Sequence, residues 1–304
     1  LHPRVRRQRQ MCIRDRFMTL HPMSFFEFLD AMGEDRLTEI IRNNDWTTVN
    51  TFAPKLSELL KQYYYVGGMP EAVLAFSEGN DWEEVRDIQN EILKSYDYDF
   101  SKHAPAEVVP RIRMLWNSLP TQLSKENRKF LYGLVKEGAR AREYEIALQW
   151  LFDGGLIHRV NNVTAPRIPL KSYEDKSAFK IFALDVGLLA AMSGLDSSTI
   201  VEGNRIFTEF KGALTEQYVL QELILHHEPY YYAKKNSQFE IDFLIQESGR
   251  VIPIEVKAEE NLKARSLRQF VTDNGSETAY RTSMSKYRQE SWMTNLPLYA
   301  VEIL

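Results

Sequence analysis

Three charged residues near the end of the chain have types and spacings that could bind a metal ion and act on a phosphate. Asp242 and Glu255 lie in two apolar segments joined by Ser248-Gly249, and Lys257 follows Glu255 by two residues. Neighbouring carboxylates repel each other unless a proton or a cation separates them, and their oxygens suit Mg²⁺ or Mn²⁺. We therefore predict that Asp242 and Glu255 bind Mg²⁺ or Mn²⁺. Lys257 would orient or deprotonate an attacking water, or stabilise charge on a phosphate.

A fourth carboxylate, Glu216, lies in a long helix that the pattern predicts for residues 209–225. Apolar side chains follow it at three, four and seven residues, so Glu216 shares the stripe that packs inward. A carboxylate that faces a sheet is costly unless a cation or hydrogen bonds compensate. We expect Glu216 to support the same site as a catalytic acid, whereas Glu222 lies off the stripe and is expected to be solvated.

Strands and a helix must position these residues. Strands are predicted for residues 230–233, 239–246 and 251–258, followed by a helix near 264–272 and a closing strand at 298–303. Successive strand side chains point to opposite faces, so Asp242 lies opposite an apolar face. That apolar face would consist of Phe239, Ile241, Phe243 and Ile245. A hairpin turn at Ser248-Gly249 then brings Asp242 and Glu255 onto one face of a compact α/β unit.

The spacing by itself is also compatible with a site that does no chemistry. An aspartate followed by about a dozen residues and Glu-x-Lys is a low-information pattern, because exposed strand faces often carry charged pairs. The alternative prediction is a nuclease-like fold that is catalytically silent and serves as a docking or regulatory module.

Residues 17–99 have a helical pattern without catalytic spacing. Ser24 followed by Glu27 is a capping-box pair, Pro54 suits a first helical position, and Gly67-Gly68 ends the helix that follows. Residues 82–93 carry a further apolar stripe. We predict a small helical bundle.

Residues 100–200 have the element order of a winged helix. Helices at 108–118, 125–135 and 143–152 precede a strand at 156–160, and residues 166–170 would form the wing. The third helix lies where a recognition helix lies, with Arg140, Arg142 and Arg159 as candidate phosphate contacts. That helix is itself acidic and apolar, so a protein partner is at least as well supported as DNA.

The composition describes an ordinary globular chain. Its 304 residues are 44% hydrophobic and 26% charged, and the net charge of −4 argues against a dedicated nucleic-acid coat. Cys12 is the single cysteine, which excludes an intramolecular disulfide or a cysteine-based zinc cluster and favours a cytoplasmic location. No stretch reaches the roughly 18 uninterrupted apolar residues of a membrane span.

Residues 1–16, LHPRVRRQRQMCIRDR, are rich in arginine and have no helical or strand period. They could form a basic arm for nucleic acid. We favour a non-native segment, because MCIRDR resembles spurious translated sequence from metagenomic assemblies and ordinary sequence begins abruptly at Phe17.

Several long strings resemble one known family. The strings GALTEQYVLQEL and YYYAKKNSQFEIDFLIQESGRVIPIEVKAEENLKARSLRQF are similar to a PD-(D/E)xK nuclease-superfamily module. That module, the domain of unknown function 4143, ends a family of AAA-type bacterial and archaeal ATPases. TLHPMSFFEFL and YVGGMPEAV resemble the family's ATPase-to-lid region, and GARAREYEIALQWLFDGGLIHRV with PRIPLKSYEDKSAFKIFALDVGLLAAMSG resembles its middle domain. The resemblance covers about residues 17–304.

The resemblance implies a mixed α/β, multi-domain chain. Its parts would be a helical lid remnant (17–99), a winged-helix-like domain (100–200) and a restriction-endonuclease-like domain (201–304). By position it assigns Asp242 and Glu255 to the metal, Lys257 to the water or phosphate, and Glu216 to the auxiliary acid. The final polar residue of the motif is either Ser266 or Gln269.

The sequence departs from the family at one important point. These ATPases begin with a P-loop, G-x-x-x-x-G-K-[ST], and no such string occurs here. We therefore expect a truncated member that binds ATP only as the full-length protein and does not hydrolyse ATP by itself. The predicted activity is metal-dependent hydrolysis of DNA or RNA phosphodiesters, with nucleic acid or a protein as partner.

Overall fold

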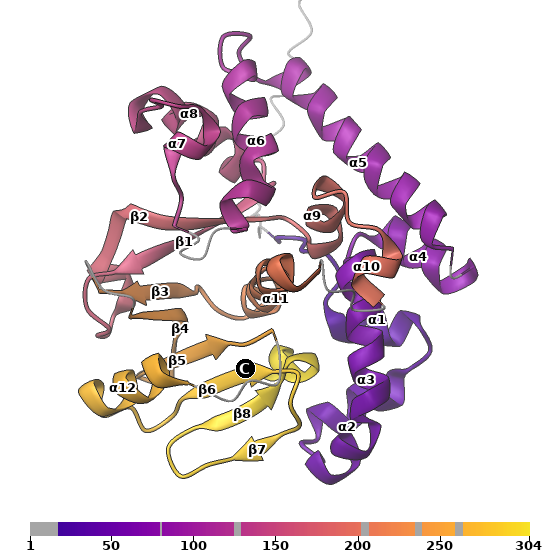
Figure 1. Cartoon of the computed structure of the whole chain (residues 1–304), viewed down its shortest axis with the longest axis vertical. Helices are drawn as coiled ribbons and strands as arrows, with labels where there is room; N and C mark the ends of the chain where they lie inside the picture. The colour runs from indigo at the N-terminus through magenta and orange to yellow at the C-terminus, as the bar shows by residue number, and fades with distance from the viewer. Residues whose placement is uncertain (1–17, 80, 125–128, 202–206, 235–238, 259–263) are drawn as a thin grey trace, which may run out of the picture.

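The computed structural model describes residues 18–304 except 80, 125–128, 202–206, 235–238 and 259–263 (Figure 1). Residues 1–16, for which we favour a non-native origin, lie outside the described residues. The described chain is a mixed α/β structure in which helices pack around one mixed sheet, confirming the predicted class. Within the described residues, none of the helices has the length and apolar character needed to cross a membrane.

The first part of the chain is helical. Its helices are α1 (Phe25–Ala31), α2 (Asp35–Arg42), α3 (Trp46–Val66), α4 (Pro70–Gly79) and α5 (Trp82–His103). Ser24 and Glu27 form the predicted capping box at the start of α1. α3 is followed by Gly67, whose positive φ of 72° favours glycine, so the predicted end of this helix is confirmed.

The middle part combines helices with a hairpin. Its elements are α6 (Val109–Leu123), α7 (Tyr132–Val135), α8 (Ala141–Asp153), β1 (Ile157–Val163), the 3₁₀ helix η1 (Leu170–Tyr173), β2 (Glu174–Ala183), α9 (Val186–Met192) and α10 (Ser197–Val201). The helix predicted for residues 125–135 is too long, since residues 129–131 are not helical. Phe130 donates its backbone N–H to the carbonyl of Phe179 at 2.8 Å, and Leu131 donates to Gln122 Oε1 at 3.0 Å. Partners elsewhere in the chain thus replace the helical hydrogen bonds.

The last part supplies most of the sheet. Its elements are α11 (Phe207–Leu223), β3 (Tyr230–Ala233), β4 (Glu240–Glu247), β5 (Arg250–Val256), α12 (Arg265–Asn274), β6 (Tyr280–Ser283), β7 (Arg288–Gln289), β8 (Thr294–Pro297) and the 3₁₀ helix η2 (Leu298–Ile303). The closing strand predicted at 298–303 is wrong. Residues 298–301 are all buried, a pattern that the two-faced alternation of a strand does not provide, and Tyr218 on α11 donates to the carbonyl of Leu298 at 3.0 Å.

The strands form one eight-stranded sheet in the order β2-β1-β3-β4-β5-β6-β8-β7. β1 and β2, from the middle part of the chain, join it through β3: Asn162 pairs with Tyr231, and Asn162 Oδ1 accepts a hydrogen bond from Ala233 at 3.0 Å. The sheet therefore runs continuously from the predicted winged-helix-like range into the predicted nuclease-like range (Figure 1).

α11 is the central helix of the molecule, between the sheet and the N-terminal helices (Figure 1). The ring of Tyr218 on α11 contacts the rings of Phe25, Tyr63 and Tyr64. One buried hydrophobic cluster extends from Phe25 to Val301 and includes residues of all three ranges predicted from the sequence. These ranges therefore pack on a common core.

The burial of Glu222 corrects the expectation that this residue is solvated. Glu222 is 1% exposed, because α11 is covered on both sides. The backbone N–H of Phe25 donates to its two carboxylate oxygens at 3.1 and 3.4 Å, and Glu302 lies beside it. Burial raises the pKa of Glu222 well above its ordinary value of 4.5, and the negative charge of Glu302 raises it further.

Glu222→Gln is expected to raise the free energy of unfolding at pH 8 and to flatten its pH dependence. A carboxyl whose pKa is raised on folding contributes stability that is fully present below its ordinary pKa of 4.5 and is lost as the pH rises through the raised value. Glutamine carries no charge to desolvate, and one pKa unit corresponds to about 1.4 kcal/mol. Denaturant unfolding at pH 5 and pH 8 measures the effect, with Glu58→Gln on the exposed surface as control. Equal pH slopes for the Glu222 variant and the wild type would contradict the prediction.

Candidate functional site

The β4–β5 hairpin carries the two predicted metal ligands. The strands pair antiparallel around a turn at Ser248-Gly249, where both residues have positive φ (48° and 75°). The predicted turn is confirmed. The register pairs Phe243 with Ile254, so the next positions, Asp242 and Glu255, lie opposite each other across the two strands.

A β-bulge interrupts β4 at residues 242–243. On its other edge, β4 advances three residues, from Ile241 to Leu244, where β3 advances two, from Tyr232 to Tyr230. An extra residue of this kind reverses the side-chain alternation and re-aims the chain locally. The single apolar face predicted for this strand is therefore wrong. Phe239 and Ile241 lie in a cluster with residues of α12, whereas Phe243 and Ile245 lie in the main core with α11.

At the bulge, the side chain of Asp242 replaces a main-chain partner. Its Oδ2 accepts a hydrogen bond from the backbone N–H of Val256 at 2.7 Å. This N–H lies just beyond the last regular β4–β5 pair, so the carboxylate satisfies a group that the ladder leaves open. Asp242 thus stabilises the opened end of the hairpin, immediately beside Glu255.

Glu255 connects the hairpin with α12 and Lys257. Its Oε1 lies 2.7 Å from Lys257 Nζ, and its Oε2 accepts a hydrogen bond from the backbone N–H of Leu267, in the first turn of α12, at 3.2 Å. Glu255 is 5% exposed, whereas the Lys257 side chain is 33% exposed. Burial raises the pKa of Glu255; Lys257 and the Leu267 N–H oppose the rise, and the charge of Asp242 adds to it.

A pocket of about 350 Å³ opens at this cluster. Four residues line it: Glu255 and Lys257 at the end of β5, and Arg265 and Ser266 in the first turn of α12. Of the two residues considered for the last motif position, Ser266 lines the pocket, whereas Gln269 is exposed on α12 outside this lining. The pocket therefore presents a carboxylate, two cationic groups and a hydroxyl to one small volume.

The donor set fits a hard divalent cation. Mg²⁺ is usually held by one or two carboxylates, and water and substrate phosphate complete its coordination. Within the described ranges, no three His, Cys, Asp or Glu side chains gather closely enough to hold a metal ion. Asp242 and Glu255 would thus be its protein ligands, and a cation would favour the ionised form of Glu255, whose pKa is raised.

Glu216 is buried, as its place on the inward stripe predicts, with 5% exposure. The cation that compensates it is Lys180 of β2, whose Nζ lies 3.7 Å from Glu216 and 2.5 Å from Glu240. Lys180 is fully buried on β2, and its partner Glu240 is the first residue of β4, two residues before Asp242. Among the described contacts, Glu216 thus shares Lys180 with Glu240, and its support of the Asp242–Glu255 site stays a prediction.

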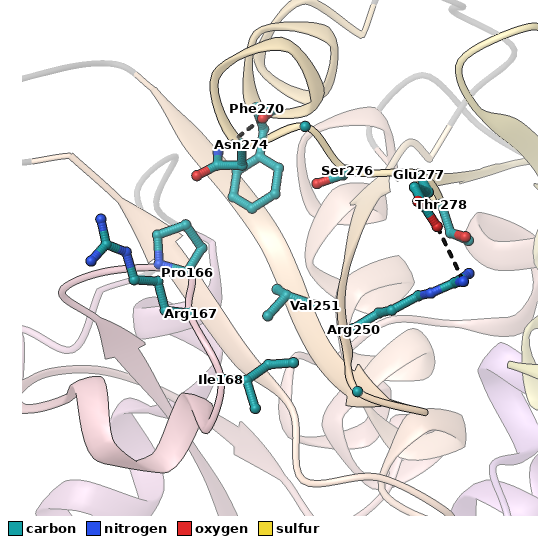
Figure 2. Close-up of a pocket in the computed structure, with 12 residues that line it drawn as sticks. Pro166, Arg167, Ile168, Arg250, Val251, Phe270, Asn274, Ser276, Glu277 and Thr278 are labelled. Atoms are coloured by element: carbon teal, nitrogen blue, oxygen red, sulfur yellow. Dashed lines mark hydrogen bonds and ion pairs between the residues drawn. The ribbon is translucent and has the colours of Figure 1, made fainter.

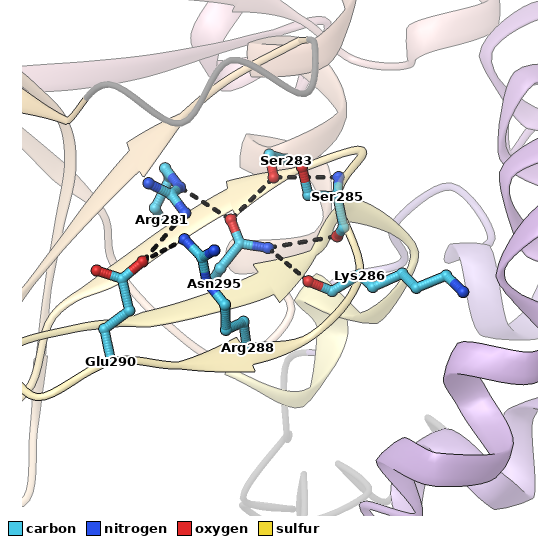
Figure 3. Close-up of polar contacts among 7 residues, drawn as sticks. All are labelled: Arg281, Ser283, Ser285, Lys286, Arg288, Glu290 and Asn295. Atoms are coloured by element: carbon cyan, nitrogen blue, oxygen red, sulfur yellow. Dashed lines mark hydrogen bonds and ion pairs between the residues drawn. The ribbon is translucent and has the colours of Figure 1, made fainter.

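Arg281 is a charged residue of this region that the sequence pattern does not reveal. It lies beside Glu255 in the β5–β6 register and beside Asn295 in the β6–β8 register. Its Nε donates to Asn295 Oδ1 at 2.9 Å, and Nη2 lies 4.0 Å from Glu290 (Figure 3). Burial lowers the pKa of Arg281, and the charges of Glu290 and Glu255 favour its charged form. β6 and β8 are four-residue strands, too short for a convincing alternation in the sequence.

The three arginines proposed to contact phosphate in the middle part do not share one environment. Arg140 and Arg142 are exposed at the start of α8. Arg159 lies on β1, where its Nε donates to Asn161 Oδ1 at 2.7 Å and its guanidinium covers the ring of Phe179 at 4.1 Å. Arg159 thus has a packing role within the β1–β2 hairpin.

Two family models match separate parts of the chain. Both are described as domains of unknown function, so neither description names an activity. Residues 57–199 match the first, DUF8612. No curated protein and no solved structure matches the chain. Residues 211–300, which contain Glu216, Asp242, Glu255 and Lys257, match a domain of unknown function, DUF4143. This match confirms the resemblance to that domain, and the resemblance to AAA-type ATPases and to nucleases stays a prediction.

Proposed function

We propose that the DUF4143 part of this chain is a metal-dependent nuclease-like module that hydrolyses phosphodiesters of DNA or RNA. The observation that carries the proposal is the contact of Glu255 with Lys257 next to Asp242, at the mouth of an open pocket. Two carboxylates and an adjacent ammonium are the groups that such hydrolysis requires: ligands for a cation and a positive charge for the reacting phosphate.

Each side chain has a distinct part in this proposal. Asp242 and Glu255 would hold Mg²⁺ or Mn²⁺, which supplies Lewis-acid activation of water and phosphate when bound. The ammonium of Lys257 would orient the attacking water or neutralise the phosphate. Arg265, on the opposite wall of the pocket, would bind a phosphate oxygen, and Ser266 would donate a hydrogen bond to it.

Metal-dependent cleavage by the purified chain is the direct test. We expect cleavage of labelled oligonucleotides with Mg²⁺ or Mn²⁺, none with a chelator, and a loss of at least about 100-fold in Lys257→Ala. Lys55→Ala is a matched control, because Lys55 also pairs with a glutamate, Glu34, at 2.6 Å but lies on α3. Activity that survives in the Lys257 variant would contradict the proposed role.

A docking or regulatory module is the second candidate function. Both oxygens of Glu255 already have partners within the protein, Lys257 and the N–H of Leu267, so the cluster is satisfied without a metal. The outer face of α8 also carries Ile146, which is 69% exposed, beside acidic residues, and this favours a protein partner for the middle part. Absence of both cleavage and Mn²⁺ binding in calorimetry would support this candidate.

The fold types of the three parts of the chain are also part of this proposal. The order α6, α7, α8, β1, β2 supports a winged-helix-like middle part, and α11 with β3–β5 and α12 supports a restriction-endonuclease-like module. The N-terminal helices would correspond to the lid of an AAA-type ATPase. Glu216 would act as the auxiliary acid once Lys180 or a nearby cation is rearranged by substrate.

A further inference from the structure

A second pocket lies at the opposite end of α12 from the candidate site. Its volume is about 460 Å³, and three segments form it: residues 166–168 between β1 and β2, residues 249–251 at the β4–β5 turn, and α12 with the loop that follows it, up to residue 278 (Figure 2). The first segment lies about 80 residues before the other two in the chain. The pocket therefore exists only in the folded molecule.

The lining combines an apolar cup with a polar wall. Figure 2 shows Pro166 at the left of the pocket, Ile168 below it and Val251 near its centre. Phe270 lies under α12 and is 1% exposed, so it closes the pocket as part of the core. Ile168 is 42% exposed, a large apolar side chain open to solvent. Ser276 lies at the upper wall. A flat ring with apolar faces and a hydrogen-bonding edge matches this arrangement, and heteroaromatic bases have that form.

Asn274 and two arginines add to the polar side of the pocket. Asn274 Nδ2 donates to the carbonyl of Phe270 at 2.9 Å, which fixes the amide at the rim. Arg250 forms an ion pair with Glu277 at 3.1 Å, so its charge is partly neutralised. Arg167 is exposed on the other side of the pocket and is the cation best placed for an anionic group. A nucleotide has a base that fits the apolar lining, a base edge that can form a hydrogen bond with the Asn274 amide, and a phosphate that can pair with Arg167.

The pocket and the candidate site are connected by two rigid elements. β5 begins at the pocket with Arg250 and Val251 and reaches the candidate site at Glu255, four residues beyond Val251, or about 13 Å at roughly 3.3 Å per residue. α12 contributes Ser266 to the site and Asn274 to the pocket, eight residues or about 12 Å apart. Stacked nucleotides are spaced by about 3.4 Å along a strand, so the distance between the second pocket and the candidate site corresponds to about four nucleotides.

We propose that this pocket binds one nucleotide of a single strand, about four steps from the Glu255–Lys257 site. The base lies against Ile168 and Val251, its edge meets Asn274 and Ser276, and Arg167 contacts the adjacent phosphate. This inference rests on the proposed nuclease-like function and gives it a substrate class: single-stranded nucleic acid longer than about four nucleotides.

Binding measured without divalent metal tests the pocket separately from cleavage. Fluorescence anisotropy of a labelled ten-nucleotide single strand with the full chain, in chelator, should show about tenfold weaker binding for Arg167→Ala and for Asn274→Ala. Arg111→Ala, on the exposed surface of α6, should bind as the wild type does. The logarithm of the binding constant falls as the logarithm of the salt concentration rises. Loss of one phosphate contact should make this slope shallower by about 0.7 in the Arg167 variant. Wild-type binding and slope in both pocket variants would overturn the inference.

A competition experiment distinguishes a nucleotide within a single strand from a free mononucleotide. An unlabelled eight-nucleotide strand should displace the labelled strand far better than a trinucleotide or adenosine monophosphate does. Equal competition by the mononucleotide would overturn the strand assignment and identify a free-nucleotide site. If the chain binds the strand through Arg167 but cleaves nothing, the proposed nuclease function is rejected and the nucleotide pocket is supported. If the chain cleaves but both pocket variants bind as the wild type does, the pocket is rejected and the nuclease function is supported. Melting curves verify that both exposed substitutions leave the fold unchanged.

Discussion

Asp242→Asn is expected to reduce metal-dependent cleavage by at least about 100-fold and to leave the fold in place. The amide oxygen of asparagine can still accept the hydrogen bond that Val256 donates to Asp242 Oδ2 at 2.7 Å. The substitution therefore removes the negative charge that a divalent cation requires and preserves the opened end of the β4–β5 hairpin. Initial rates in Mg²⁺ and Mn²⁺, together with Mn²⁺ titration calorimetry, measure the loss.

Two further variants separate the charge of Asp242 from its structural hydrogen bond. Asp242→Ala loses both and should also be destabilised by about 1 kcal/mol, because the N–H of Val256 is left without this partner. Asp273→Asn is the control, since Asp273 is a half-exposed aspartate on α12 that pairs with Lys234 at 3.2 Å. Cleavage by Asp242→Asn at the wild-type rate would show that this carboxylate holds no essential cation.

Gly187→Ala is expected to destabilise the protein by about 3 kcal/mol, as overpacking against fixed backbone does. A Cβ atom at Gly187 would lie 2.6 Å from the carbonyl oxygen of Val66 and 2.7 Å from the backbone nitrogen of Gly67 and from Gln89 Nε2. The backbone atoms at the end of α3 cannot rotate away as a side chain can. α9 would have to move off α3, and the contacts of that junction would be lost.

The junction of α3 and α9 has little room to adapt. Asp185, at the start of α9, accepts hydrogen bonds from the N–H groups of Gly68 at 2.6 Å and Leu188 at 2.9 Å, and it is fully buried. Gly133→Ala on α7 is the matched control, because a Cβ there meets nothing within 4 Å, and it should be neutral or stabilising by up to about 1 kcal/mol. Denaturant unfolding compares the two variants. A Gly187 variant as stable as the Gly133 variant would contradict the close packing.

Local signals account for the parts of the fold that the sequence predicts well. The turn at Ser248-Gly249, the capping box at Ser24 and the helix near residues 264–272 each depend on neighbouring residues in the chain. Strand β3 is found at its predicted residues, 230–233. The end strand predicted at 298–303 fails because its apolar residues are buried all round, and the pattern of an apolar run does not distinguish a strand from a buried 3₁₀ helix.

In the candidate site, too, local sequence predicts some features and tertiary packing decides others. Residue types and spacing place Asp242, Glu255 and Lys257 on one hairpin, and the structure brings them together. The alternation argument for Asp242 does not hold through the bulge, which depends on pairing with β3 as well as β5. Arg281 and the pocket residue Arg265 escape a sequence-based search because their positions beside Glu255 depend on strand order and on where α12 packs.

The sequence by itself determined which residues could do chemistry, the hairpin that carries them, and the inward placement of Glu216. Only the tertiary structure decided that Glu216 meets Lys180, that Glu222 is buried at the start of α1, and that a second pocket lies at the far end of α12. The physical reason is the range of the interactions. Hydrogen bonds of turns, caps and helices join residues a few positions apart, whereas these ion pairs and pockets form where segments tens to hundreds of residues apart exclude water together.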